Sequence, residues 1–156
     1  MKASDFRDSA PMTVAFVAEG LCWGSFAAQV PVLKAQIGAS DSQFGTAMLV
    51  AALGAVTAMW LAPRVERSLG APAMAILGLG MALFFLLPGL LGSVVLFALA
   101  MMMASVFSGT LDVVMNARVS VMEASVGRSL MGYHHGVFSV AYALSAFMTG
   151  LRGPVG

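Results

Sequence analysis

A stretch of chain with a single charged residue constrains this fold more than any other feature of the sequence. Between Pro72 and Arg118 the only charged side chain is that of Asp112. A helix crosses a hydrocarbon core about 30 Å thick with about 20 residues, so this stretch is far too long for one crossing. The chain is therefore predicted to turn back inside it, and Pro88-Gly89 is the best place for the turn.

The composition of the whole chain agrees with a membrane protein. Its 156 residues are 60% hydrophobic and 10% charged, whereas ordinary globular chains are roughly 25% charged. A net charge of +1 offers no basic surface for a phosphate backbone, which argues against a nucleic-acid partner. The lone Cys22 cannot form an internal disulfide. The continuous apolar runs also differ from the alternating segments of about ten residues in an outer-membrane barrel.

The predicted fold class is therefore all-α integral membrane protein, with five membrane-spanning helices. A cytoplasmic tail over residues 1–11 precedes a membrane domain over residues 12–152, and residues 153–156 form a truncated end. The second span is predicted to stop at Pro63, and the connector 118–130 to be partly helical. The predicted spans cover residues 12–32, 43–62, 73–87, 94–117 and 131–151.

The positions of lysine and arginine predict the orientation. With a cytoplasmic N-terminus, six of the eight basic residues lie inside and two outside, which is the usual bias of short cytoplasmic loops. We therefore predict a multi-pass protein of the inner (plasma) membrane, with the lipid bilayer as its surroundings. The inside set is Lys2, Arg7, Arg64, Arg67, Arg118 and Arg128, and the outside set is Lys34 and Arg152.

Small residues at four-residue spacing predict how the helices pack, because helices in lipid associate through close backbone contact. A single set of this kind is common in membrane helices, so their repetition carries the inference. The sets are Ala47, Ala51 and Ala55; Ser105 and Gly109; and Gly132 and Gly136.

Two acidic residues, Glu19 and Asp112, fall inside predicted spans. An ionisable group there costs at least about 2.5 kcal/mol and usually faces protein or water. Each acid is therefore a candidate for holding a proton or contacting a solute. The alternative for Glu19 is a neutral, hydrogen-bonded structural acid. The alternative for Asp112 is a clasp to Arg64 or Arg67 that acts as a cytoplasmic gate.

Helical periodicity places further polar side chains on three helix faces. We expect these faces to turn inward around a shared aqueous cavity, because lipid penalises unpaired polar groups. For each hydroxyl the alternative is a hydrogen bond to the carbonyl of the preceding turn. Of the two adjacent histidines, His135 rather than His134 lies on the polar face. The predicted cavity residues are Glu19, Gln29, Asp112, Asn116, His135, Ser139 and Tyr142.

Motifs of enzymes and of cofactor sites are missing from the sequence. It contains no H-E-x-x-H, no G-x-S-x-G, no cysteine pair and no glycine-rich phosphate loop. His134 and His135 point to different sides of a helix and cannot both face one metal. We predict no enzyme activity, no cofactor and no metal. An intramembrane enzyme with Asp112 and His135 as an acid–base pair remains an alternative, and it requires the two side chains to lie within hydrogen-bond reach.

Several stretches resemble the major facilitator superfamily, and more narrowly its fucose-permease-like branch. The most specific stretch contains Asp112 and Asn116, followed by Glu123 and His135-Gly136. It is similar to the fourth helix of that branch, where an acid and an asparagine line the cavity and, in sugar/proton symporters, take part in proton coupling. In those symporters the first helix holds a second acid at a place that is Ala27 here.

Two other stretches share the resemblance. Trp23-Gly24 with the following Pro31 looks like the first helix of that branch. In the connector that begins at Arg64, the run Glu66-Arg67-Ser68-Leu69-Gly70 is similar to the superfamily's acid-Arg-x-Gly signature between helices two and three. The resemblance implies twelve helices in two six-helix bundles, with substrate held between them. The five predicted helices resemble helices 1–5 of the N-terminal bundle.

The predicted function is that of the N-terminal part of a secondary active transporter for a small polar solute, such as a sugar, with proton coupling as one option. The missing C-terminal half of the transporter, or a homo-oligomer, would complete the cavity. The alternative is a small membrane-embedded assembly or regulatory subunit without transport activity.

Overall fold

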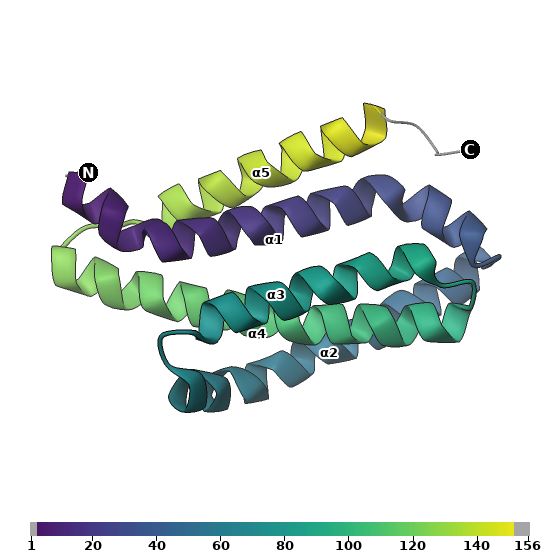
Figure 1. Ribbon diagram of the computed structural model, residues 1–156, viewed down its shortest axis with the longest axis horizontal. Helices are drawn as coiled ribbons and strands as arrows, with labels where there is room; N and C mark the ends of the chain where they lie inside the picture. Colours follow the sequence, from purple (N-terminus) through teal and green to yellow (C-terminus); the bar gives the residue numbers. More distant parts are fainter. Residues whose placement is uncertain (1–2, 152–156) are drawn as a thin grey trace.

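The computed structural model consists of long, nearly parallel and antiparallel helices (Figure 1). It describes the backbone of residues 3–151 and the side chains of residues 7–151, so Lys2, Arg152 and the predicted end at 153–156 lie outside the described residues. The described part contains no strand. Its elements are α1 Ala3–Gln36, α2 Asp41–Leu69, α3 Ala73–Leu86 with a 3₁₀ turn at Leu87–Leu90, α4 Val94–Val126 and α5 Met131–Leu151.

The predicted turn at Pro88-Gly89 is confirmed, and it is tied to the end of α1. The side-chain amide of Gln36 donates to the carbonyls of Pro88, Gly89 and Leu91 at 3.3, 3.2 and 2.8 Å. Carbonyls at the end of a helix lack intrahelical partners, so Gln36 satisfies the groups that the turn exposes. The short connection between α3 and α4 is thereby fixed.

α2 continues as a helix through Pro63 to Leu69, beyond the residue at which the second membrane span is predicted to stop. Proline removes the hydrogen bond to the carbonyl four residues earlier, that of Met59. The guanidinium of Arg64 donates to the neighbouring Trp60 carbonyl at 2.6 Å. The Trp60 carbonyl is not the one that loses its partner at Pro63, so this hydrogen bond does not explain why the helix continues. The limits of the membrane spans themselves remain predictions.

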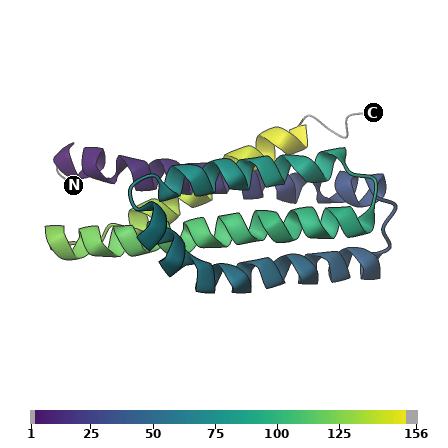
Figure 2. The same ribbon diagram turned by 60° about the horizontal axis from the view of Figure 1, so that its bottom comes forward.

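α4 lies between α2 and α3 (Figure 2). An added Cβ at Gly54 would lie 2.2 Å from the Met102 carbonyl oxygen, and one at Gly109 would lie 2.9 Å from the Ala58 Cβ. The predicted small face of α4 is therefore confirmed. On α2 the buried small residues include Gly54 and Ala58, whereas the predicted Ala55 is exposed, because the face drifts with the helical repeat of 3.6 residues.

α5 packs along α1 (Figure 1) through two other glycines. An added Cβ at Gly20 would lie 2.6 Å from the Phe138 carbonyl oxygen, and one at Gly24 would lie 2.3 Å from that of Tyr142. The predicted pair Gly132 and Gly136 is exposed, and no atom lies within 4 Å of an added Cβ at either position. Within the described helices α5 meets α1 through Phe138, Ala141 and Tyr142 instead, so close packing at Gly132 and Gly136 remains a prediction.

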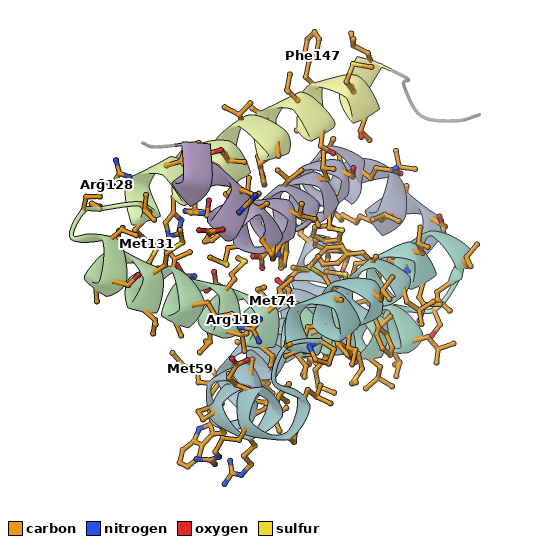
Figure 3. All side chains as sticks on the ribbon, turned by 60° about the vertical axis from the view of Figure 1, so that its left-hand side comes forward. Met59, Met74, Arg118, Arg128, Met131 and Phe147 are labelled. Carbon is orange, nitrogen blue, oxygen red and sulfur yellow. The ribbon has the colours of Figure 1, made fainter. Side chains whose placement is uncertain are left out.

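The outside of the bundle is apolar, as expected for a membrane protein. Met59 on α2 and Phe147 on α5 project outward, at 68% and 62% exposure (Figure 3). Among the described residues, four segments are long and apolar enough to cross a membrane: Arg7–Gln36, Asp41–Leu69, Ala73–Leu90 and Val94–Val126. The predicted all-α membrane fold is confirmed at this level, and a membrane crossing by α5 remains a prediction.

Candidate functional site: a polar layer between α1 and α4

Two buried polar groups, one on α1 and one on α4, lie between two apolar clusters. One cluster contains Phe16 of α1 and Leu111 of α4, and the other contains Phe26 of α1 and Met101 of α4. Glu19 and Ser108 fall between these clusters along their helices and are 5% and 3% exposed. A polar layer therefore crosses the middle of an otherwise apolar helix pair.

The Glu19 carboxylate belongs to a chain of three hydrogen-bonding side chains. The Ser108 hydroxyl donates to Glu19 Oε1 at 2.5 Å, and the Trp23 indole Nε1–H donates to Ser108 Oγ at 2.9 Å. The indole meets Phe85 of α3 edge-on, with ring centroids 4.9 Å apart, and Phe26 at 5.9 Å. The buried acid is thus joined to α1, α3 and α4.

Asp112 lies one turn after Ser108 and within electrostatic range of Glu19 and of His135. It is half-buried, and the Asn116 amide donates to its carboxylate and to its backbone carbonyl, each at 2.8 Å. In the described part of the chain no hydrogen bond or ion pair joins Asp112 to His135. The structure therefore does not support the acid–base pair that an intramembrane enzyme would require.

The predicted residues of α5 are less enclosed than expected. His135 is exposed and meets the Phe16 ring at 5.2 Å, whereas His134 is buried, with Nδ1 2.9 Å from the Leu130 carbonyl oxygen. Ser139 is exposed and donates to the His135 carbonyl of its own helix at 2.9 Å. Its hydroxyl thus follows the structural alternative.

Gln29 and Tyr142 complete the predicted set, and they differ in burial. Gln29 is exposed on α1, and Tyr142 is half-buried on α5 with its ring 6.1 Å from that of Phe138. Of the predicted residues, the structure therefore brings together Glu19, Asp112, Asn116 and His135. Ser108 and Trp23, which the prediction left out, connect them to the bundle.

Two hollows lie along α1 and α5, away from these residues. The larger one, about 590 Å³, is apolar and is lined by residues such as Val17, Leu21 and Gly136; the smaller, about 260 Å³, lies near Ser145 and Thr149. Neither hollow includes a predicted cavity residue. Glu19 is instead packed between helices, and the proposed solute contacts lie on half-buried or exposed faces.

The α2–α3 connector is held by a residue that sequence reasoning missed. Arg118 forms a two-pronged ion pair with Glu66, with N–O distances of 3.0 and 2.9 Å (Figure 3 labels Arg118). It also donates to the Gly70 carbonyl at 2.5 Å. Arg64 donates to a backbone carbonyl and Asp112 bonds Asn116; among the described residues no ion pair joins Asp112 to Arg64 or Arg67, so the alternative of a clasp is not seen.

Glu123, beyond the predicted fourth span, holds the start of α5. Its Oε1 accepts the backbone N–H groups of Met131 and Leu130 at 2.7 and 2.5 Å, and the Ser129 hydroxyl at 3.1 Å. These hydrogen bonds, led by those from Met131 and Leu130, hold the pKa of the Glu123 carboxyl below its usual value. The carboxylate therefore acts as a cap for N–H groups that the first turn of α5 leaves free.

Two curated proteins are similar to this chain. An uncharacterized MFS-type transporter of Yersinia pestis is 31% identical over 134 residues, which are 85% of this chain and 35% of that protein. The uncharacterized transporter y4wD of Sinorhizobium fredii is 30% identical over 135 residues, 84% of this chain and 35% of that protein. Both similar proteins are named as transporters, and one of them as an MFS-type transporter.

The chain spans about a third of the length of these curated relatives, at 35% of each. No family model matches it, and no solved structure matches it. The names of these relatives agree with the predicted resemblance at the level of the superfamily. The fucose-permease-like branch remains a prediction, because the names of the relatives do not distinguish branches.

Proposed function

We propose that this chain is the N-terminal part of a secondary active transporter in which Glu19 holds a coupled proton. One observation carries the proposal: a carboxyl group 5% exposed lies between two apolar clusters, with a serine hydroxyl as partner, in a chain related to transporters. Ionising such a group inside a membrane is costly unless protein or water compensates. A carboxyl in this position can therefore take up and release a proton as water access changes.

The neighbouring polar groups suit contact with a small polar solute such as a sugar. Asn116, Tyr142 and His135 supply hydrogen-bond donors and acceptors on half-buried or exposed faces of α4 and α5. Solute sites of secondary transporters lie near the membrane midplane between repeats that rock against each other. The opposite wall would come from a further half of the transporter or from a second copy. The proposed location is the inner membrane, with the N-terminus in the cytoplasm.

The proposal is tested by uptake measurements on the complete transporter in proteoliposomes. Glu19→Gln should abolish uptake driven by a pH gradient and leave solute exchange across the membrane intact, because exchange needs no net proton movement. Asp112→Asn should weaken both processes. Asp8→Asn, which neutralises an exposed acid near the N-terminus, is the matched control and should change neither. Gradient-driven uptake that survives Glu19→Gln would contradict the proposal.

A membrane-embedded subunit without transport activity is the second candidate, and the open face of α5 favours it. Gly132 and Gly136 leave room for close approach of another helix next to the apolar hollow. In that case Glu19→Gln and Asp112→Asn should weaken a complex and leave solute flux unchanged. Co-purification of the variants with their partner chain distinguishes the two candidates.

A further inference from the structure

Resting on the proposed function, we propose that Ser108 and Trp23 are positioning residues for proton exchange at Glu19. The Trp23 indole fixes the Ser108 hydroxyl, and that hydroxyl can serve the carboxyl in both of its protonation states. The geometry that carries this inference is the continuous chain from Trp23 Nε1 to Ser108 Oγ, 2.9 Å, and from Ser108 Oγ to Glu19 Oε1, 2.5 Å.

A count of donors and acceptors shows why a serine suits this place. A hydroxyl has one proton to donate and two lone pairs to accept with. With Glu19 ionised, Ser108 donates to the carboxylate and accepts the indole N–H, as observed. With Glu19 protonated, the acid can donate to the second lone pair of Ser108, whose own proton turns to a carbonyl of the preceding turn of α4. The carboxyl thus has a partner in both states.

Trp23 differs from Ser108 because it can only donate. Its indole is held edge-on by Phe85 and Phe26, at interplanar angles of 78° and 87°, so its N–H points at Ser108 whatever the state of Glu19. Because the Trp23 N–H can donate but cannot accept a hydrogen bond, it holds the Ser108 hydroxyl oxygen in one orientation. It thereby strengthens the hydrogen bond from Ser108 to an ionised Glu19 carboxylate. Phe85 belongs to α3, so the same contact joins the proton site to a third helix.

Other ionisable groups near Glu19 come from three helices. Cys22 lies on α1, Asp112 on α4, and His134 and His135 on α5 near Phe16. α3 contributes none, since Ala73–Leu86 contains no ionisable residue. A titration that follows Glu19 must therefore separate it from Asp112, the other carboxyl in the layer.

Difference infrared spectroscopy of the purified chain tests the proposal without a transport assay. The carbonyl band of a protonated carboxylic acid is followed during a pH titration, and Glu19→Gln and Asp112→Asn assign the two bands. Ser108→Ala should move the Glu19 midpoint to higher pH by about one unit, a tenfold change in proton affinity, because a hydrogen bond to the charged form is lost. Trp23→Phe keeps an aromatic ring and should move it in the same direction by less.

Two variants make the result specific to the hydroxyl chain. Ser105→Ala removes a buried hydroxyl one turn away on α4 and should leave the Glu19 midpoint unchanged. Ser108→Thr keeps a hydroxyl and should restore the midpoint if Ser108→Ala has moved it. Equal midpoints in Ser108→Ala, Trp23→Phe and the unchanged protein would overturn the inference. So would an equal shift in Ser105→Ala, because it would indicate a general change of packing.

The outcome separates this inference from the proposed function. If the Glu19 midpoint responds to Ser108→Ala while uptake by the complete transporter is independent of the pH gradient, the positioning role stands and proton coupling fails. If uptake depends on the gradient and on Glu19 but the midpoint ignores Ser108 and Trp23, coupling stands and the positioning role fails. Circular dichroism of each variant, unchanged in helix content, confirms that the bundle is intact.

Discussion

Gly24 of α1 packs closely against α5, whereas Gly136 of α5 has open space beside it, and the two together provide a quantitative test of the packing. An alanine Cβ at Gly24 would lie 2.3 Å from the Tyr142 carbonyl oxygen, whereas carbon–oxygen contacts begin at about 3.3 Å. The helices would have to separate by about 1 Å to relieve the overlap. That movement would also stretch the bond from the Ser145 hydroxyl to the Leu21 carbonyl, which is 2.8 Å long. Gly24→Ala therefore disturbs the whole contact between α1 and α5.

The cost follows from these contacts. Overpacking a well-packed contact costs about 1–3 kcal/mol, and the stretched hydrogen bond places Gly24→Ala near the upper value, about 3 kcal/mol. Gly136→Ala on the facing helix is the matched control, because no atom lies within 4 Å of its added Cβ. There the substitution should stabilise by about 0.4–1 kcal/mol, since glycine loses more freedom on folding.

Reversible unfolding in micelles by added SDS, followed by circular dichroism, measures both changes. The expected result is a large loss of unfolding free energy for Gly24→Ala and a small gain for Gly136→Ala. Equal effects of the two substitutions would refute the assignment of the packed and open faces of the two helices. The control has a second use, because Gly136→Ala would weaken a complex if the open face of α5 receives a partner helix.

Three further predictions concern the ends of the helices. Arg118→Lys keeps the charge but loses the two-pronged contact with Glu66, so the free energy of unfolding should fall by about 1 kcal/mol. In the same unfolding assay the double variant Arg118→Lys with Glu66→Gln should be only slightly less stable than Arg118→Lys alone. Hydrogen bonds hold the pKa of the Glu123 carboxyl in the folded protein below its usual value. Glu123 therefore stabilises the first turn of α5 fully at pH values above the pKa of the unfolded chain, and this stabilisation is lost as the pH falls through the lower pKa of the folded protein. Amide exchange at Met131, corrected for the intrinsic rate, should show this acid dependence, and Glu123→Gln should remove it. The orientation is tested by cysteine labelling in the Cys22→Ser background. Ser42→Cys, on the proposed outside, should react with a membrane-impermeant thiol reagent added to intact cells, and Arg67→Cys, on the proposed inside, should not. The opposite pattern contradicts the proposed orientation.

Features set by local sequence could be predicted, and features set by contacts between distant residues could not. The break at Pro88-Gly89 follows from the length of the uncharged stretch and from local turn chemistry, and the structure confirms it. At Pro63, in contrast, the residue alone does not mark the end of a helix, because α2 passes through it to Leu69.

In the candidate site, too, features set by local sequence could be predicted and contacts between distant residues could not. Glu19 and Asp112 could be found from the sequence because an acid inside an apolar run is costly wherever it lies. The partners Ser108 and Arg118 lie 89 and 52 residues from the acids that they bind, so no local spacing reveals the pairs. The signal that could have found Arg118 is its place as the first basic residue after the apolar stretch. Helical periodicity places Ser108 on the same face as Asp112, but it does not single out this hydroxyl, since serine is common in membrane helices.

The proposed proton site and the proposed solute site differ in how complete they are within this chain. Glu19, Ser108 and Trp23 come from α1 and α4, with Phe85 of α3 behind them, and Glu19 is enclosed by helices that the chain itself supplies. Asp112 is only half-buried and His135 is exposed. The groups that a proton titration of Glu19 follows therefore all lie on these helices, whereas the proposed solute site relies on the proposed opposite wall facing α4 and α5. Proton affinity and solute affinity should accordingly be separable, with the first measurable on this chain and the second only where the opposite wall is present.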